Sequence, residues 1–263
     1  MDRKKYGRKE FIAFLGKASL GAAVAPPFLV RCGMNSAPLP SQALSAEHVQ
    51  RLKDLVLESL EPSDADDLLL TSGLDHHVVV KWLDRINDDD TFGFNCDFNC
   101  FLPFDEEDPN DGLLWVNHEY PDPLFVSGYN FTDPQRVRTK EQVDKEMYSV
   151  GGSIVRVRKE NGKWQVVPND PHNRRITAHT PIRLNWDAPI KGKNTVIGTH
   201  SNCAGGITPW KTFLTCEENY YECYGETQHH SDGSTTLIPS DYGWEQYYDH
   251  PPEHYGWVVE IDP

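Results

Sequence analysis

The chain has 263 residues, a formal net charge of −15 and 38% hydrophobic residues, which is enough for a packed core. Residues 1–32 hold seven basic and two acidic residues, so the rest of the chain carries a net charge of −20. Such an acidic body excludes nucleic-acid binding through phosphate neutralisation and is suited to collecting divalent cations. The sequence contains no Gly-x-Ser-x-Gly, P-loop or dinucleotide-binding motif, which argues against serine hydrolases, NTPases and Rossmann dehydrogenases.

Residues 1–32 are typical of an export signal. A basic start is followed by an apolar run from Phe11 to Val30 that glycine, lysine and proline residues interrupt too often for a membrane-spanning helix. The segment from Gly7 to Ile12 resembles a twin-arginine export signal in which Lys9 replaces the second arginine. The sequence therefore predicts a periplasmic or extracellular protein, and the alternative is an ordinary amphipathic first helix.

Six cysteines bear on localisation and on metal binding. The segment from Leu29 to Cys32 resembles a lipoprotein cleavage box, which would tether the protein to a membrane through Cys32, although Arg31 stands where a small residue is expected. Without Cys32 five cysteines remain, an odd number that leaves one free thiol or one thiol as a metal ligand. Cys203 and Cys216 are close enough in sequence to form a disulfide bond.

The remaining chain is expected to be mainly β. Residues 33–44 form a linker rich in serine, proline and alanine, and Ser45 is a plausible N-cap for a helix to about Leu60. Residues 45–263 then form one domain in which short strands and many Gly and Pro residues point to a sandwich, barrel or propeller. The pattern alone does not choose among these three folds.

The predicted strands are short and lie between turn signals. A tight hairpin is expected around Asn161-Gly162, because this pair adopts the positive φ angles that a two-residue turn needs. The final predicted strand ends one residue before the chain does, and its open edge favours an N-terminal portion of a longer protein. The segments predicted to form strands are His76–Trp82, Gly112–His118, Ser153–Arg158, Lys163–Val167 and Tyr255–Asp262.

Two segments place cation-binding side chains on or after strands. In Phe92–Cys100, alternation would present Asn95, Asp97 and Asn99 on one strand face, where their oxygens suit a hard cation. A polar, solvated strand face is the alternative. In the second segment, a hydrophobic strand beginning near Trp115 delivers Asn117, His118 and Glu119 together at its end. A lone histidine is usually structural, but three ligand-type residues at one strand end favour a functional site.

A third segment, Asn202–Asn219, ends in the adjacent carboxylates Glu217 and Glu218. These follow a short apolar run, Thr212–Thr215, that favours a strand. Within a strand the two side chains would point to opposite faces, whereas at the edge of a loop both can converge on one cation. Two solvated surface acids are the alternative. The histidines from His229 to His254 have no clean ligand spacing and are expected at the surface.

These motifs together resemble the PhoX family of secreted bacterial alkaline phosphatases, in order from about residue 75 to the end of the chain. The resemblance implies a six-bladed β-propeller, incomplete in this chain, that hydrolyses small phosphate monoesters through an embedded cluster of calcium and iron. The protein is expected to be a monomer. It also implies that further metal ligands and a phosphate-binding arginine lie in a C-terminal half. The motifs are Phe92–Phe98, Gly112–Tyr120, Asn173–Thr177, Asn202–Asn219 and Tyr255–Asp262.

The resemblance also assigns site residues by position. Glu217 and Glu218 match the family's metal-binding carboxylate pair, and the motif with Asn95 and Asp97 supplies a further ligand. Glu119 lies in the Asn-His-Glu-Tyr motif and is a further metal ligand by this resemblance. The candidates for a catalytic group are Glu217 and His118.

One departure from the family pattern concerns iron. Family members are expected to carry a bridging cysteine near the second motif, and Trp115 occupies the corresponding position here. Either Cys96 or Cys100 would then substitute, or calcium would dominate the site. Two other functions remain open: a non-catalytic propeller stiffened by calcium, and a calcium-dependent propeller esterase or lactonase.

Overall fold

The computed structural model describes residues 60–132 and 137–263. The chain divides into two compact units, Met1–Asp75 and His76–Pro263. The predicted export signal, the tether at Cys32, the linker 33–44 and all but the last residue of the helix predicted from Ser45 lie outside the described residues. Within the described ranges, no helix is both long enough and apolar enough to cross a membrane.

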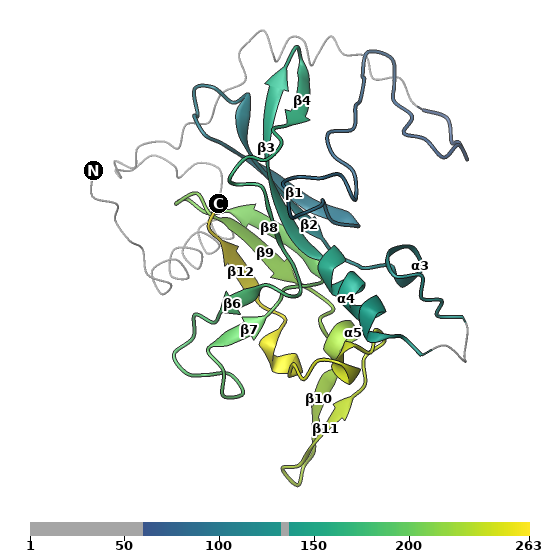
Figure 1. Cartoon of the computed structure of the whole chain (residues 1–263), viewed down its shortest axis with the longest axis vertical. Helices are drawn as coiled ribbons and strands as arrows, with labels where there is room; N and C mark the ends of the chain where they lie inside the picture. The colour runs from purple at the N-terminus through teal and green to yellow at the C-terminus, as the bar shows by residue number, and fades with distance from the viewer. Residues whose placement is uncertain (1–59, 133–136) are drawn as a thin grey trace, which may run out of the picture. The chain divides into compact units, whose positions relative to one another are not determined.

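The second unit is mainly β and consists of antiparallel sheets (Figure 1). The largest sheet has the order β1 (Cys96–Pro103), β2 (Asp111–His118), β3 (Gly151–Glu160) and β4 (Lys163–Val166), and β5 (Arg174–Ile176) also pairs with β3. A three-stranded sheet has the order β12 (Val258–Ile261), β9 (Phe213–Glu217) and β8 (Asn202–Ile207). Two-stranded sheets are formed by β6 (Pro181–Arg183) with β7 (Thr195–Ile197), and by β10 (Glu226–His229) with β11 (Thr235–Ile238).

Short helices connect these strands. They are the α-helices α3 (Pro123–Val126), α4 (Lys140–Ser149) and α5 (Tyr221–Tyr224), and the 3-10 helices η1 (Trp244–Gln246) and η2 (Pro252–His254). Helix α4 begins at a capping box, in which the Thr139 hydroxyl accepts from the Gln142 backbone and the Gln142 side chain accepts from the Thr139 backbone. It packs Val143 and Met147 into a core that includes Trp244 and Tyr255.

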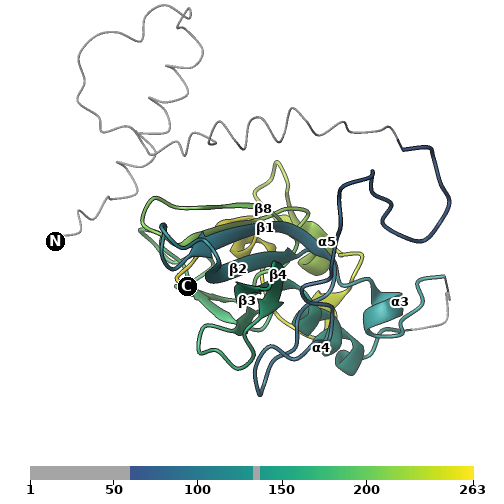
Figure 2. The same cartoon turned by 90° about the horizontal axis from the view of Figure 1, so that it is seen from above.

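The two larger sheets pack against each other. Figure 2 shows β8 lying over β1 and β2. Leu113 and Trp115 of β2 point into the core between the sheets, and the Trp115 ring stacks on Phe213 of β9 with 6.0 Å between ring centroids. Because side chains alternate along a strand, Val116 of β2 packs on the opposite face, in a second core with Phe92. Strand β2 is therefore buried on both faces.

The strongest strand predictions are confirmed. The segment predicted as Gly112–His118 is β2, and the predicted hairpin is β3–β4, in which Glu160 pairs with Lys163. The turn residues Asn161 and Gly162 have φ angles of 50° and 81°, which are the positive values that this turn requires.

Other predictions about local structure are wrong. Residues 76–82 form no strand, because the segment packs as a loop in which His77 Nε2 accepts a hydrogen bond from the Trp164 backbone at 3.1 Å. Of the predicted strand Tyr255–Asp262, only Val258–Ile261 pairs with β9. His254 is buried rather than at the surface, and its Nε2 lies 3.0 Å from the Ile190 carbonyl oxygen.

The proposed disulfide between Cys203 and Cys216 is absent, and the five cysteines among the described residues all have free thiols. The register between β8 and β9 explains this difference. Asn202 pairs with Glu217 and Ala204 pairs with Cys216, so Cys203 is the extra residue of a β-bulge and does not face Cys216.

Candidate metal centre

Two carboxylates and one thiol meet where the two larger sheets adjoin. One ligand atom from each of Asp97, Glu119 and Cys203 lies within 4.8 Å of the other two. Asp97 is at the start of β1, and Glu119 directly follows β2. Because β1 and β2 are antiparallel, the start of one strand adjoins the end of the other, and β8 brings Cys203 to the same place.

Two β-bulges shape this cluster. The register of β1 against β2 shifts between Cys96 and Asn99, and the register of β8 against β9 shifts between Asn202 and Ala204. At a β-bulge, the side chain of the extra residue does not follow the alternation between the two sheet faces that the other residues of the strand show. The bulged segments contain Asp97 and Cys203, the members that β1 and β8 contribute, so the bulges allow these side chains to meet Glu119.

The electrostatics of the cluster show mutual repulsion. Burial raises the pKa of Glu119, and the nearby charges of Asp97 and Glu218 raise it further. A hydrogen bond to the Glu218 carboxylate, together with burial and the neighbouring Asp97, raises the pKa of the Cys203 thiol to about 12. A bound cation would oppose these shifts, because it favours the deprotonated form of each ligand.

The donor set fits a metal. Several carboxylate oxygens suit a hard cation such as calcium, and a thiolate suits iron. Among the described residues, no lysine, arginine or histidine forms an ion pair with Asp97, Glu119 or Glu218. The negative charge of these carboxylates is therefore available to a cation.

The predicted carboxylate pair divides between two environments. Glu218 lies near the cluster, since it raises the pKa values of both the Cys203 thiol and Glu119. Glu217 instead accepts hydrogen bonds at Oε2 from the backbone of Gly256 at 2.8 Å and of Trp257 at 3.0 Å. Burial raises the pKa of Glu217 to about 7, although these backbone donors oppose the shift.

Asn95 and His118 occupy different positions. The Asn95 carbonyl oxygen accepts from the Glu119 backbone at 3.1 Å, which ties the segment before β1 to the residue after β2. His118 is fully buried, and its Nε2 lies 2.8 Å from the Ser153 hydroxyl. Burial holds the pKa of His118 well below its usual value, so the ring is a neutral core group and does not face solvent.

The thiol in the cluster comes from a segment different from the one expected. Trp115 is fully buried in the core between the sheets, while Cys100 lies at the edge of that same core. Among the described cysteines, Cys203 is the one that groups with carboxylates. Cys203 lies in the same segment of the sequence as Glu218, and this proximity is the signal that could identify it as a ligand. The β-bulge that turns the Cys203 side chain toward Asp97 is not visible in the sequence.

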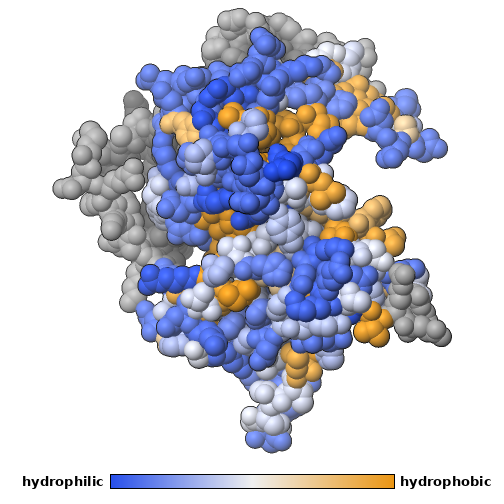
Figure 3. All heavy atoms as spheres, in the orientation of Figure 1, coloured by the Kyte–Doolittle hydropathy of each residue, from blue (hydrophilic) through white to orange (hydrophobic). Residues whose placement is uncertain are grey.

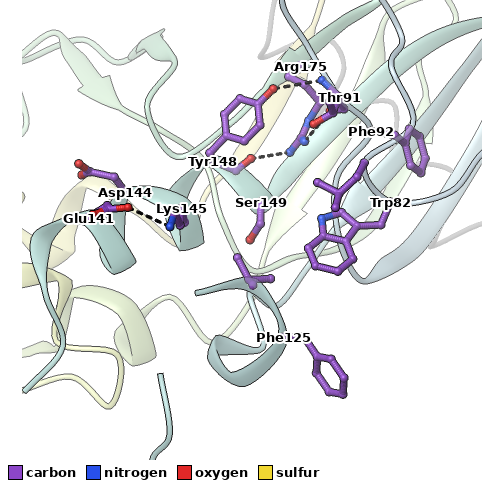
Figure 4. A pocket seen from close by; sticks show the side chains of 12 residues that line it. Trp82, Thr91, Phe92, Phe125, Glu141, Asp144, Lys145, Tyr148, Ser149 and Arg175 are labelled. Carbon is purple, nitrogen blue, oxygen red and sulfur yellow. Dashed lines mark hydrogen bonds and ion pairs between the residues drawn. The ribbon is translucent and has the colours of Figure 1, made fainter. Parts of the chain in front are cut away.

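A separate cavity of about 590 Å³ lies beside α4. Figure 4 shows the rings of Trp82 and Phe125 on one side of it and the pair of Glu141 and Lys145 on the other. Lys145 is held 3.0 Å from Glu141, and Arg175 donates to four backbone carbonyl groups. Because both cations already have partners, this cavity is a poor match for a phosphate group.

Two comparisons with known proteins point to one family. The family model for alkaline phosphatase PhoX matches residues 55–263. Among solved structures, Pseudomonas fluorescens PhoX in complex with vanadate, a transition state analogue, is similar with a TM-score of 0.56 and 28% sequence identity. The comparison with curated proteins gives no match.

The structural similarity confirms the mainly β, propeller-like fold, and it covers 71% of this chain and 38% of the Pseudomonas chain. The chain thus spans well under half the length of that relative. The motifs that carry the resemblance lie within the residues that the family model matches. Because this model matches most of the chain, the protein belongs to the PhoX alkaline phosphatase family.

Proposed function

We propose that this chain supplies part of the metal site of an exported alkaline phosphatase that hydrolyses phosphate monoesters. The observation that supports this proposal most directly is the cluster of Asp97, Glu119 and Cys203, with Glu218 close enough to raise the pKa of the thiol. Membership of the PhoX family supports the reaction class.

In this proposal the four clustered side chains hold calcium and iron. Bound cations of this kind neutralise phosphate oxygens and stabilise the leaving oxygen. The chain's own residues provide the anionic ligands, and the bulges in β1 and β8 set their positions. Asn95 and Glu217 are proposed as further ligands from their positions in the family motifs. In this structure the Glu217 carboxylate accepts hydrogen bonds from the backbone of Gly256 and Trp257. If it is not a ligand, Glu217, with a pKa of about 7, is a candidate to hold or release a proton near neutral pH.

The charge of the protein supports a cation-dependent site. The formal net charge is −15, and the face shown in Figure 3 is largely hydrophilic with several apolar regions. A body this acidic repels an anionic phosphoester, so binding of the substrate needs local positive charge. We further propose that the protein acts as a monomer in the periplasm or outside the cell, with Cys32 as a lipid tether where the leader is processed in that way.

The test is hydrolysis of p-nitrophenyl phosphate by the full-length protein. Asp97→Asn and Glu119→Gln should each lower kcat/KM by about 10- to 100-fold or more, since loss of ligand charge weakens metal binding. Asp105→Asn and Glu107→Gln remove the same charges from an exposed loop and should leave the rate unchanged. Full activity in the Glu217→Gln/Glu218→Gln double variant, or in the presence of chelator, would rule out the proposal.

Two further measurements separate the alternatives. Elemental analysis that finds calcium without iron, together with no turnover, would favour a calcium-stiffened scaffold. A panel of carboxylic esters and lactones at fixed calcium concentration would reveal an esterase or lactonase.

A further inference from the structure

We infer that Asn117 is a positioning residue that holds the backbone of Cys203 in place for the cluster, an inference that rests on the proposed function. Asn117 is fully buried and lies two residues before Glu119. On this face of β2 the side chains change from the apolar Leu113 and Trp115 to the amide of Asn117, where the core between the sheets ends.

The Asn117 amide uses its full hydrogen-bonding capacity. Its Nδ2 donates to the carbonyl oxygens of Cys203 at 3.0 Å and Ala204 at 3.1 Å. Its Oδ1 accepts from Trp115 Nε1 at 2.7 Å and from the Thr215 hydroxyl at 2.9 Å. An amide has two donors and two acceptor sites, and all four are used here.

These partners fix the orientation of the amide. An indole nitrogen can only donate and a backbone carbonyl can only accept, so Oδ1 must face Trp115 and Nδ2 must face Cys203. An aspartate in this position would set a carboxylate against two carbonyl oxygens. Position 117 therefore requires an amide side chain, and neither an apolar nor a charged side chain could make the same four hydrogen bonds.

The carbonyl groups that Asn117 binds belong to the bulge. In a regular ladder, hydrogen bonds to the neighbouring strand would fix the orientation of these carbonyl groups. Here the register between β8 and β9 shifts between Asn202 and Ala204, which interrupts the ladder. Asn117 thus supplies, from the other sheet, hydrogen bonds that hold the bulged peptide groups. Because the Cys203 thiol lies with Asp97 and Glu119, a shift of this bulge would move one ligand away from the other two.

Asn202, which directly precedes Cys203 in β8, connects the bulge to the same hydrogen-bond network. Asn202 Nδ2 donates to the hydroxyl groups of Thr199 at 2.8 Å and Thr215 at 3.0 Å, and Thr215 in turn donates to Asn117. The chain of hydrogen bonds therefore runs from β2 through β9 to β8. Asn202 Oδ1 is buried without a hydrogen-bond partner among the described residues, so Asn202 is held through its Nδ2 alone. Because hydrogen bonds in a buried network depend on one another, removal of one member affects the rest.

The chain offers a closely matched control. Asn173 is also a buried asparagine, and its Nδ2 donates to the carbonyl oxygens of Ile86 and Val167, both at 2.8 Å. It ties a loop to the largest sheet and is not part of the cluster. Asn173→Ala removes the same chemical group and the same kind of hydrogen bonds as Asn117→Ala, so a comparison separates loss of stability from loss of ligand position.

The experiment measures metal affinity rather than turnover. Metal-stripped full-length protein is titrated with Fe²⁺ under anaerobic conditions, and alkylation of Cys203 by iodoacetamide is followed by peptide mass spectrometry with and without the metal. In the wild type, Fe²⁺ should slow alkylation of Cys203, because a thiolate suits iron. Asn117→Ala should weaken Fe²⁺ binding about 10- to 100-fold and remove this protection, whereas Asn173→Ala should change the affinity less than about threefold.

The outcomes are distinct. If the folded Asn117→Ala protein binds Fe²⁺ as the wild type or as Asn173→Ala does, the positioning role is wrong. If Asn117→Ala fails to fold, Thr215→Val, which removes one donor to Asn117, should weaken binding by a smaller factor, and unchanged binding would overturn the inference. If wild-type protein takes up neither Ca²⁺ nor iron, the proposed function fails together with the inference, a result visible before any variant is compared.

Discussion

The carboxylate of Asp111, at the start of β2, accepts hydrogen bonds from two arginines of the neighbouring strand β3. Arg156 contacts both of its oxygens, at 2.9 and 2.7 Å, and Arg158 Nε lies 2.9 Å from Oδ2. The hydrogen bond from Arg156 is the main reason that the pKa of Asp111 falls to about 2. A carboxyl group whose pKa is lower in the folded state stabilises the fold above its unfolded pKa, and this contribution is lost as the pH falls toward the folded value.

We therefore expect Asp111→Asn to cost about 1–2 kcal/mol at neutral pH, with allowance for the partial exposure of the group. The difference in unfolding free energy from the wild type should stay constant above about pH 4 and shrink between about pH 4 and pH 2. Urea denaturation of metal-stripped protein at several pH values measures this difference. Asp105→Asn in the exposed loop is the control, and a difference for Asp111→Asn that did not vary with pH would contradict the argument.

Residue types and predicted strand ends are sufficient to identify Asp97, Glu119 and Glu218 as candidate ligands, because carboxylates at the ends of strands can converge on one cation. The same reasoning could not place Cys203 with them. Its side-chain direction depends on a bulge, and a bulge depends on how two strands pair, which the residue itself does not encode. The sequence also makes His118 a functional candidate, whereas in the structure Ser153 on the neighbouring strand provides a buried partner for it.

At the scale of elements, predictions from the sequence succeed where local pattern and final packing agree. Strand β2 has an apolar run, and the β3–β4 turn has its Asn161-Gly162 pair, so each is specified locally. Helix α4 was not predicted, since Val143 and Met147 are its only buried apolar positions and the third long buried side chain is Glu146. Glu146 is buried because Ser127, Arg138 and Trp244 surround it, which only the tertiary structure provides.

The start of α4 gives a test at this scale. Thr139 Oγ1 accepts from the Gln142 backbone at 3.3 Å, and the Gln142 side chain accepts from the Thr139 backbone at 3.0 Å. Thr139→Ala removes the first bond and should lower the unfolding free energy by about 1 kcal/mol, as loss of an N-cap generally does. Thr139→Ser keeps the hydroxyl and should lie close to the wild type in chemical denaturation. Equal stability of the two variants would show that the cap contributes nothing.

At the scale of the whole unit, the cluster joins two sheets that no described ladder connects. Asp97 lies in the largest sheet and Glu119 directly follows its strand β2, while Cys203 lies in the three-stranded sheet and Glu218 directly follows its strand β9. The contact between these sheets is an apolar core that ends in Asn117 and then in acidic groups. The repulsion among these acids opposes the packing, and a bound cation would convert it into attraction between the sheets.

Removal of these carboxylates should therefore change the melting temperature in opposite directions with and without bound metal. With Ca²⁺ at about 100 times its Kd, binding to the folded state alone stabilises by about 2.7 kcal/mol, which corresponds to a rise in Tm of roughly 5–10 °C for a protein of this size. The Asp97→Asn/Glu119→Gln double variant should lose this rise. In chelator, however, the variant should melt at or above the wild-type temperature, because it lacks the repulsion that raises the pKa of Glu119.

The control for this crossover is Asp105→Asn/Glu107→Gln, which changes the net charge equally in an exposed loop. It should keep both the Ca²⁺-dependent rise and the wild-type Tm in chelator. Scanning calorimetry of the three full-length proteins, each with Ca²⁺ and with chelator, gives all six values. If the cluster variant melts below the wild type under both conditions, its carboxylates support the fold in some way other than by binding a cation. If the Ca²⁺-dependent rise is the same in all three proteins, calcium binds elsewhere in the protein.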